Sequence, residues 1–176
     1  MAQVPFKLKG CFGAHIGYHT RTMAETFKHV YAFEPNKDIF PFLSRNMNGY
    51  NNVTCLPYGV GDKSGTFSFN SHNISARSHL DNEPCLKSRD VGCVEALVLD
   101  DVNHIFSFPI GFIKIDIEGG EILAIKGMVK LIKRDKPVIV FEDHNGSTIA
   151  FIQATLPEYY IEKIDASNFK AIHKTS

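Results

Sequence analysis

The sequence lacks the long apolar run that a membrane-spanning helix requires, and it has no excess of charge of either sign. No stretch reaches the ~18 apolar residues of a membrane span, and no basic-then-apolar signal peptide precedes the first expected strand. Nineteen Lys and Arg side chains balance nineteen Asp and Glu side chains, so net charge attracts neither nucleic acid nor an anionic membrane surface. We therefore expect a cytoplasmic protein without a nucleic-acid or membrane partner.

Cysteines are few, and their spacing is uninformative. The four residues Cys11, Cys55, Cys85 and Cys93 form no Cys-x-x-Cys pair and have no zinc-ligand spacing with histidine. A zinc site and a disulfide framework therefore have little support, and a reducing compartment is expected.

What the sequence does contain is the alternating pattern of an α/β domain. Its 176 residues, 44% of them hydrophobic, suffice for one domain with a substantial core. Short apolar strands alternate with amphipathic helices, which predicts a doubly wound, mostly parallel sheet over residues 1–176. The expected strands are Phe6 to Phe12, Val30 to Phe33, Asn52 to Pro57, Thr66 to Phe69, Cys93 to Leu99, one beginning at Phe112, Pro137 to Phe141, Tyr160 to Asp165 and Phe169 to His173, the last two as a hairpin. The expected helices are Tyr18 to Phe27, one around Phe40 to Met47 capped by Asp38, Glu121 to Lys133 and Thr148 to Thr155.

The polar segment 71–90 is expected to be a variable substrate-side loop, with a disordered spacer as the alternative.

The strand that begins at Phe112 carries charges at every second position. Side chains alternate along a strand, so Lys114, Asp116 and Glu118 share one face. Carboxylates are costly to bury unless they are paired, and ligands of such sheets bind beyond the carboxyl ends of the strands. We therefore predict a ligand crevice here, with Lys114 neutralising Asp116 or a nearby carboxylate.

A second signal is the glycine loop Gly13-Ala-His-Ile-Gly17 between the first strand and its helix. Glycine lets a ligand approach the backbone, and the helix start offers free N–H groups. Glu34, at the end of the second strand, is positioned to accept hydrogen bonds from two ribose hydroxyls. The glycine spacing differs from Gly-x-Gly-x-x-Gly, and a tight turn without a ligand is the alternative.

Taken in order, these blocks resemble the FkbM family of S-adenosylmethionine (SAM)-dependent methyltransferases over about Cys11 to His144. The resemblance is carried by Gly13 to Thr20, Val30 to Asn36, Asn52 to Thr54, Gly61-Asp62, Leu99 to Asp101, Ile113 to Glu121, Lys126-Gly127 and Pro137 to Glu142. It implies a class I methyltransferase fold, Rossmann-like, usually with seven strands and an antiparallel C-terminal strand.

The resemblance also implies the cofactor and its contacts. SAM would be bound by Gly13, Ala14, Gly17, Tyr18, His19, Thr20, Glu34, Pro35, Gly61 and Asp62, with Asp116 near its methionine end. Two positions depart from the family. Cys11 stands where an acidic residue usually meets the cofactor's ammonium group, and His15 stands where asparagine is common.

The candidate catalytic residues are His144, Asp116 and Glu142. Methyl transfer depends on orientation, and a hydroxyl acceptor benefits from a general base, for which His144 is best placed. His72 and His79 are weaker candidates for the base, and an incidental loop histidine is the alternative reading of His144. Carboxylates of Asp116 and Asp143 with Asn145 could hold a divalent cation, but we predict no metal site.

The leading hypothesis is a SAM-dependent methyltransferase that O-methylates a hydroxyl of a sugar or related small metabolite, with no oligomeric state selected. A nicotinamide-dependent oxidoreductase would share the glycine loop and Glu34, but the glycine spacing disfavours it. A degenerate binding module of the same fold is a third hypothesis, motivated by Cys11.

Overall fold

The computed structural model describes residues 8–70, 91–106, 109–117 and 119–175. Glu118 and the predicted substrate-side loop 71–90 therefore lie outside the described residues, as do His72 and His79.

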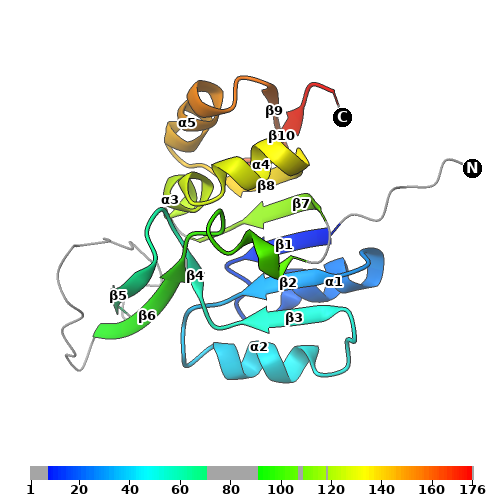
Figure 1. The fold of residues 1–176 in the computed structure, drawn as a ribbon, viewed down its shortest axis with the longest axis vertical. Helices are drawn as coiled ribbons and strands as arrows, with labels where there is room; N and C mark the ends of the chain where they lie inside the picture. The colour runs from blue at the N-terminus through cyan, green and yellow to red at the C-terminus, as the bar shows by residue number, and fades with distance from the viewer. Residues whose placement is uncertain (1–7, 71–90, 107–108, 118, 176) are drawn as a thin grey trace, which may run out of the picture.

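Seven strands form the main sheet, in the order β3-β2-β1-β7-β8-β10-β9 (Figure 1). Its strands are β1 (Leu8–Phe12), β2 (Val30–Phe33), β3 (Val53–Leu56), β7 (Ile110–Ile115), β8 (Val138–Glu142), β9 (Tyr159–Lys163) and β10 (Asn168–His173). The first five are parallel, whereas β10 runs antiparallel to both β8 and β9. This order confirms the predicted doubly wound sheet with its antiparallel C-terminal strand and closing hairpin.

Helices cover both faces of this sheet, and β2 shows how its residues divide between them. Val30 and Ala32 join one buried cluster, which includes side chains of α1 (Tyr18–Thr26) and α2 (Phe40–Met47). Tyr31 and Phe33 join the other cluster, with side chains from α3 (Glu121–Lys126), α4 (Val129–Asp135) and α5 (Ser147–Thr155). All four β2 residues are buried, as expected for a parallel strand covered on both sides.

A smaller sheet was not predicted. It consists of β4 (Gly59–Val60), β5 (Gly65–Asn70) and β6 (Val91–Leu97), in the order β4-β6-β5. Strands were expected near β5 and β6, but Gly59–Val60 was expected to be part of a turn, and the separation of these strands from the main sheet was not expected. Figure 1 shows β5 and β6 beside the carboxyl ends of the main strands, at the left of the view. A short 3-10 helix, η1 (Asn103–Ile105), follows β6 and precedes β7.

The helix predicted from Glu121 to Lys133 is instead two helices, α3 and α4, which break at Gly127. A Cβ added at Gly127 would lie 1.9 Å from the carbonyl oxygen of Gly61. The Gly127 carbonyl accepts the Asp100 N–H at 2.9 Å, and the Asp100 carboxylate accepts the N–H groups of Lys130 and Leu131 at 2.9 and 2.8 Å. This carboxylate satisfies the free donors of a new helix start, so the chain ends one helix and begins another.

The start of α2 also differs from the prediction, because Asp38 does not cap it. The cap position is Ile39, without a side-chain cap hydrogen bond, and proline occupies the first turn. The carbonyl of Asn36 accepts the N–H of Phe40 at 2.8 Å, while the Asn36 side chain accepts the N–H of Asp38 at 2.9 Å. Asn36 therefore organises this turn.

The cysteines require a further correction. Cys93 is disulfide-bonded, whereas Cys55 is a free thiol whose pKa burial raises. Sequence spacing does not report which sulfurs meet in a fold, so the expectation of no disulfide is wrong at Cys93.

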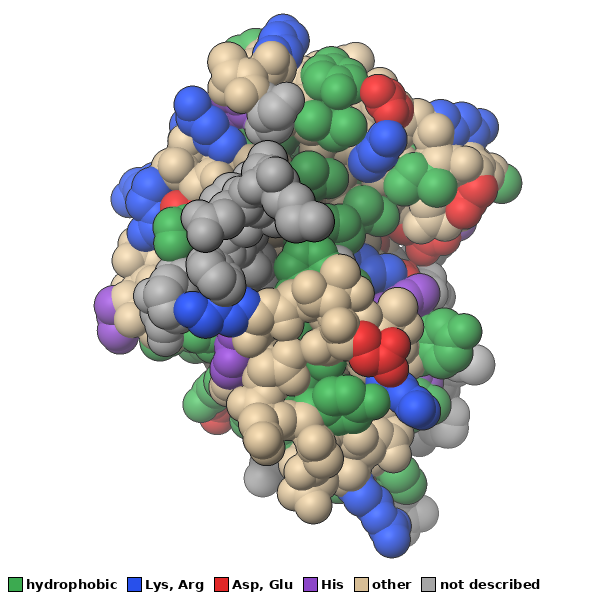
Figure 2. Space-filling view, turned by 90° about the vertical axis from the view of Figure 1, so that its right-hand side faces the viewer, with side chains coloured by type: hydrophobic (Ala, Val, Ile, Leu, Met, Phe, Trp, Pro, Cys, Tyr) green, Lys and Arg blue, Asp and Glu red, His purple; other side chains and the backbone are tan. Residues whose placement is uncertain are grey.

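Charge is dispersed on the face at the amino ends of the strands. Figure 2 shows this face, with Lys and Arg side chains scattered among acidic, apolar and other ones. In the part of the chain that the structure describes, no helix is both long enough and apolar enough to span a bilayer.

Candidate functional site

Four of the predicted site residues follow one row of paired residues across the main sheet. Phe33 of β2 is in register with Phe12 of β1, Phe12 with Ile115 of β7, and Ile115 with Phe141 of β8. The next residue along each strand is a predicted site residue, namely Glu34, Gly13, Asp116 and Glu142. Neighbouring strands lie ~4.8 Å apart, so this row is a continuous edge along which a ligand can lie.

The glycine loop packs directly on the turn after β7. Gly13 has a φ of 75°, and a Cβ added to it would lie 1.8 Å from the carbonyl oxygen of Asp116. Gly17 has a φ of 95° and precedes α1, where an added Cβ would touch Leu43 and Met47 of α2 at 3.0 Å. Positive φ favours glycine at both positions, and at Gly13 the close approach to the Asp116 backbone carbonyl also requires it.

Glu34 holds the glycine loop against the end of β2. Its Oε2 accepts the backbone N–H of His15 at 2.9 Å, and its Oε1 accepts the N–H of Asn36 at 2.9 Å. His15 has a φ of 49°, an uncommon conformation for a residue with a side chain, and this bond helps to hold it. Glu34 is buried, yet an ionised carboxylate has about four acceptor positions, so capacity remains on both oxygens.

Lys114 and Asp116 form the predicted ion pair, with Nζ and Oδ2 2.5 Å apart. The Lys114 side chain is nearly buried, while that of Asp116 is 40% exposed and can meet a ligand. The charges of both groups influence the pKa of His19, in the first turn of α1. Burial lowers the pKa of His19, the Lys114 charge lowers it further, and the Asp116 charge opposes this shift. The neutral imidazole is thus favoured beside the pair.

Sequence analysis gave Glu121 no role, although it fixes the turn that follows Asp116. This carboxylate is buried at the start of α3 and accepts the N–H groups of Ile117 and Gly119 at 3.3 and 3.2 Å. An acidic residue just after a glycine pair at a helix start was the available signal.

Glu142 and His144 meet at the end of β8. The His144 Nε2 lies 3.4 Å from Glu142 Oε1, and the imidazole side chain is 70% exposed. Asp143, between them, is buried and accepts the N–H groups of Asn145, Gly146 and Ile149 at 3.1, 2.8 and 2.9 Å. Asp143 therefore stabilises the loop that carries His144 and the first turn of α5.

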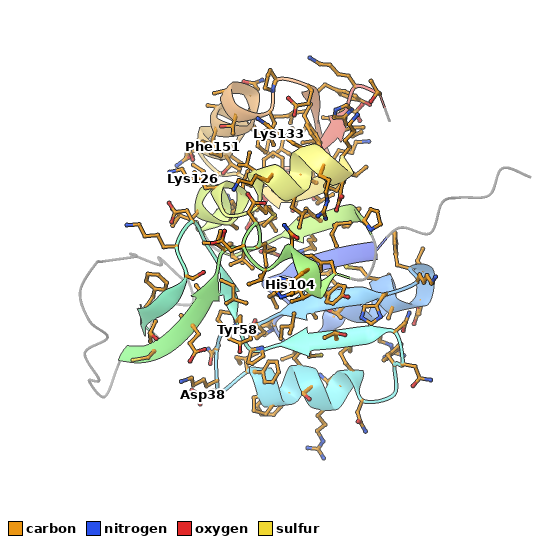
Figure 3. The ribbon with its side chains drawn as sticks, viewed as in Figure 1. Asp38, Tyr58, His104, Lys126, Lys133 and Phe151 are labelled. Atoms are coloured by element: carbon orange, nitrogen blue, oxygen red, sulfur yellow. The ribbon has the colours of Figure 1, made fainter. Side chains whose placement is uncertain are left out.

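The helix after this loop is anchored from α3. Lys126 on α3 points toward Phe151 on α5 (Figure 3), with Nζ 5.8 Å from the ring centroid. Contacts of this kind are worth ~0.5–1 kcal/mol at exposed sites, so Lys126 helps to keep α5 and its preceding loop in place.

The remaining predicted cofactor residues differ in accessibility. Ala14 is buried, Tyr18 is 78% exposed, and Thr20 is fully buried with no hydrogen-bond partner for Oγ1 among the described residues. Pro35 lies beside the start of β4, so that a Cβ added at Gly59 would lie 3.6 Å from Pro35 Cβ. Gly61 and Asp62 follow β4 of the smaller sheet, where the Gly61 N–H donates to the Leu97 carbonyl at 3.1 Å, and neither lies in the row at the main sheet's edge.

The cation hypothesis receives no geometric support from the described residues, among which no group of three His, Cys, Asp or Glu side chains could hold a metal ion. Asp143 is instead occupied by three backbone donors. The arrangement offers a hydrogen-bonding carboxylate at Glu34, an ion pair at Lys114–Asp116 and a carboxylate–imidazole pair at Glu142–His144.

A family model and a curated relative identify the family of this chain. The model of the "Methyltransferase FkbM domain" matches residues 12–170. The hexuronic acid methyltransferase AglP of Haloferax volcanii is 31% identical over 137 residues, which are 76% of this chain and 54% of that protein. The chain thus spans about half the length of this curated relative.

Solved structures share the fold. The FkbM methyltransferase of Methylobacillus flagellatus superimposes with a TM-score of 0.65 at 21% identity, over 95% of this chain and 43% of that one. A Streptococcus mutans protein in complex with S-adenosylhomocysteine (SAH) gives a TM-score of 0.54 at 9% identity, over 94% and 86% of the two chains.

Proposed function

The chain belongs to the FkbM methyltransferase family, and we propose from this premise that it transfers a methyl group from SAM to an oxygen of a sugar or related small metabolite. The observation that carries the proposal is the row Glu34, Gly13, Asp116 and Glu142, which continues one register across four parallel strands. Ligands of such sheets bind at this edge. The nicotinamide-dependent and binding-module alternatives are not favoured by the family match.

The residues present fit the proposed cofactor. Glu34 keeps acceptor capacity for ribose hydroxyls after its two backbone bonds. The loop from Gly13 to Gly17 brings backbone close to the same edge, and the Lys114–Asp116 pair lies two strands from Glu34, roughly 10 Å away along the row. Asp116 would contact the methionine end. When bound, SAM supplies an electrophilic methyl group on a sulfonium.

On the protein side, His144 would act as the general base. An imidazole nitrogen can accept a proton, and the Glu142 carboxylate, 3.4 Å from Nε2, would orient the ring. His144 Nδ1 is then the atom that receives the proton of the acceptor hydroxyl. A positioned general base contributes about 10²–10⁴-fold to a rate, and orientation of the two substrates would contribute the rest.

Acidic sugars are the first acceptors to test, because the curated relative is a hexuronic acid methyltransferase. Wild-type protein would be incubated with SAM and hexuronic acids or neutral sugars, and products analysed by mass spectrometry for one added methyl group. Isothermal titration with SAH and with NADH would test the cofactor separately. Saturable NADH binding with no SAH binding would overturn the proposal.

The product also reports which oxygen reacts. A methyl ether, stable in alkali, identifies a hydroxyl acceptor and requires a base, so His144→Ala would lower kcat by about 10²-fold or more. An alkali-labile methyl ester identifies a carboxylate acceptor, which is already deprotonated, and would contradict the role proposed for His144.

A further inference from the structure

Ser167 reaches the site from the hairpin turn between β9 and β10. Its Oγ donates a hydrogen bond to Glu142 Oε1 at 3.0 Å, and the same oxygen faces His144 Nε2 at 3.4 Å. The side chains of Ser167, Glu142 and His144 therefore lie in a row, with the Glu142 carboxylate between the other two. No signal in the sequence distinguished Ser167 from other turn serines.

The backbone of Ser167 is held from both sides. Its N–H donates to Asp165 Oδ1 at 3.1 Å, and its carbonyl accepts the N–H of Asp143 at 2.9 Å. Asp165 also accepts the backbone and side-chain N–H groups of Asn168 at 2.9 Å, which lower the pKa of its carboxyl group. The turn therefore presents the Ser167 hydroxyl from a fixed backbone.

Glu142 has few other restraints on its carboxylate. It is the last residue of β8, paired with Asn168 of β10 through the backbone, and its side chain is 21% exposed. An ionised carboxylate only accepts hydrogen bonds, so the Ser167 hydroxyl must be the donor. His144 is largely exposed, so packing restrains its ring little, and its orientation depends on where the Glu142 oxygen lies.

We infer that Ser167 is a positioning residue for methyl transfer, which fixes the Glu142 carboxylate so that Glu142 in turn orients the His144 imidazole. This inference rests on the proposed function, in which His144 is the general base. It makes the β9–β10 turn part of the active site, although the turn lies more than twenty residues after His144 in the chain.

A double-mutant cycle in the full chain tests this inference. The variants are Ser167→Ala, Ser167→Thr, His144→Ala and the Ser167→Ala/His144→Ala double variant, with kcat, acceptor KM and SAH Kd measured for each. Ser147→Ala is the matched control, because Ser147 is an exposed serine at the start of α5. Thermal unfolding of each variant checks that it is folded.

We expect Ser167→Ala to lower kcat about 10-fold, a fraction of what a positioned base contributes, with acceptor KM and SAH Kd unchanged. Ser167→Thr restores most of kcat because it returns the hydroxyl, and Ser147→Ala has no effect. In the His144→Ala background, Ser167→Ala causes no further loss, because residues that act through one another are non-additive.

Other outcomes separate the two levels of the hypothesis. An equal loss in both backgrounds, or a parallel rise in SAH Kd, assigns Ser167 a merely structural role and overturns the inference. If His144→Ala is impaired while Ser167→Ala matches wild type, the inference alone fails. If His144→Ala retains wild-type kcat, the proposed base fails and the inference fails with it.

Discussion

Replacing Gly13 by alanine tests whether the glycine loop must touch the turn after β7. Gly13 and Gly146 have nearly the same positive φ, 75° and 80°. Their surroundings differ, because a Cβ at Gly13 would lie 1.8 Å from Asp116 O and 3.0 Å from Ile117 Cγ2, whereas a Cβ at Gly146 meets nothing within 4 Å. Gly146→Ala is therefore a matched control that isolates close approach from backbone handedness.

The two variants should differ clearly in their free energy of unfolding. A left-handed conformation costs a residue with a Cβ roughly 1–2 kcal/mol, and the stiffer unfolded chain returns ~0.4–1 kcal/mol, so Gly146→Ala should lose roughly 0–1.6 kcal/mol. At Gly13 the Asp116 carbonyl must also retreat by roughly 1.2 Å in a close-packed interior. Such overpacking costs ~1–3 kcal/mol, so Gly13→Ala should lose about 2–4 kcal/mol.

Urea unfolding followed by circular dichroism measures these losses, since the chain has no tryptophan to report by fluorescence. The second expected effect is weaker binding of SAH, because the glycine loop would be displaced from Asp116. Titration of the folded protein with SAH in the absence of urea measures this affinity. Equal stability and equal SAH affinity for Gly13→Ala and Gly146→Ala would refute the proposed close packing between the loop and the turn.

Three further predictions concern single side chains. Glu34→Gln should weaken SAH binding by ~1–3 kcal/mol, by loss of charge-assisted bonds; unchanged affinity in calorimetry would contradict the ribose assignment. Tyr159→Phe should leave the free energy of unfolding unchanged or raise it by up to ~1 kcal/mol, because this buried hydroxyl has no hydrogen-bond partner among the described residues. A large loss of stability in urea unfolding would contradict this expectation. Burial lowers the pKa of His29 below its ordinary 6.5, so below pH 6.5 the unfolded chain binds more protons than the folded one, and stability should fall as the pH decreases from there. His29→Gln should flatten this pH dependence of stability in urea titrations. An unaltered slope would exclude His29 as the source of the pH dependence.

The main sheet was predictable because its signals are local. The apolar runs at Val30 to Phe33 and Pro137 to Phe141 each stop at an acidic residue, and parallel strands bring such stops to one edge. The pairing of Lys114 with Asp116 followed from the two-residue period of a strand. In each case the relevant contact lies within a few residues or is imposed by the sheet itself.

What the sequence did not predict depends on distant partners. The break at Gly127 places that residue against the carbonyl of Gly61, and the second sheet requires β6 to pair with β4 and β5. Local periodicity carries no information about such contacts. Ser167 was missed for the same reason, since its partner Glu142 lies 25 residues away.

The acidic residues at this edge divide into two groups by what they bind. Glu34, Glu121 and Asp143 are buried and each accepts two or three backbone N–H groups, so each closes the turn beside a strand end. Asp116 and Glu142 instead pair with side chains and keep exposed surface. A reaction that depends on orientation needs turns that hold their geometry before substrates arrive. The first group provides that rigidity, and in the proposed function the second would face the reacting groups. Glu34 is a member of the first group whose remaining acceptor capacity would serve the ribose.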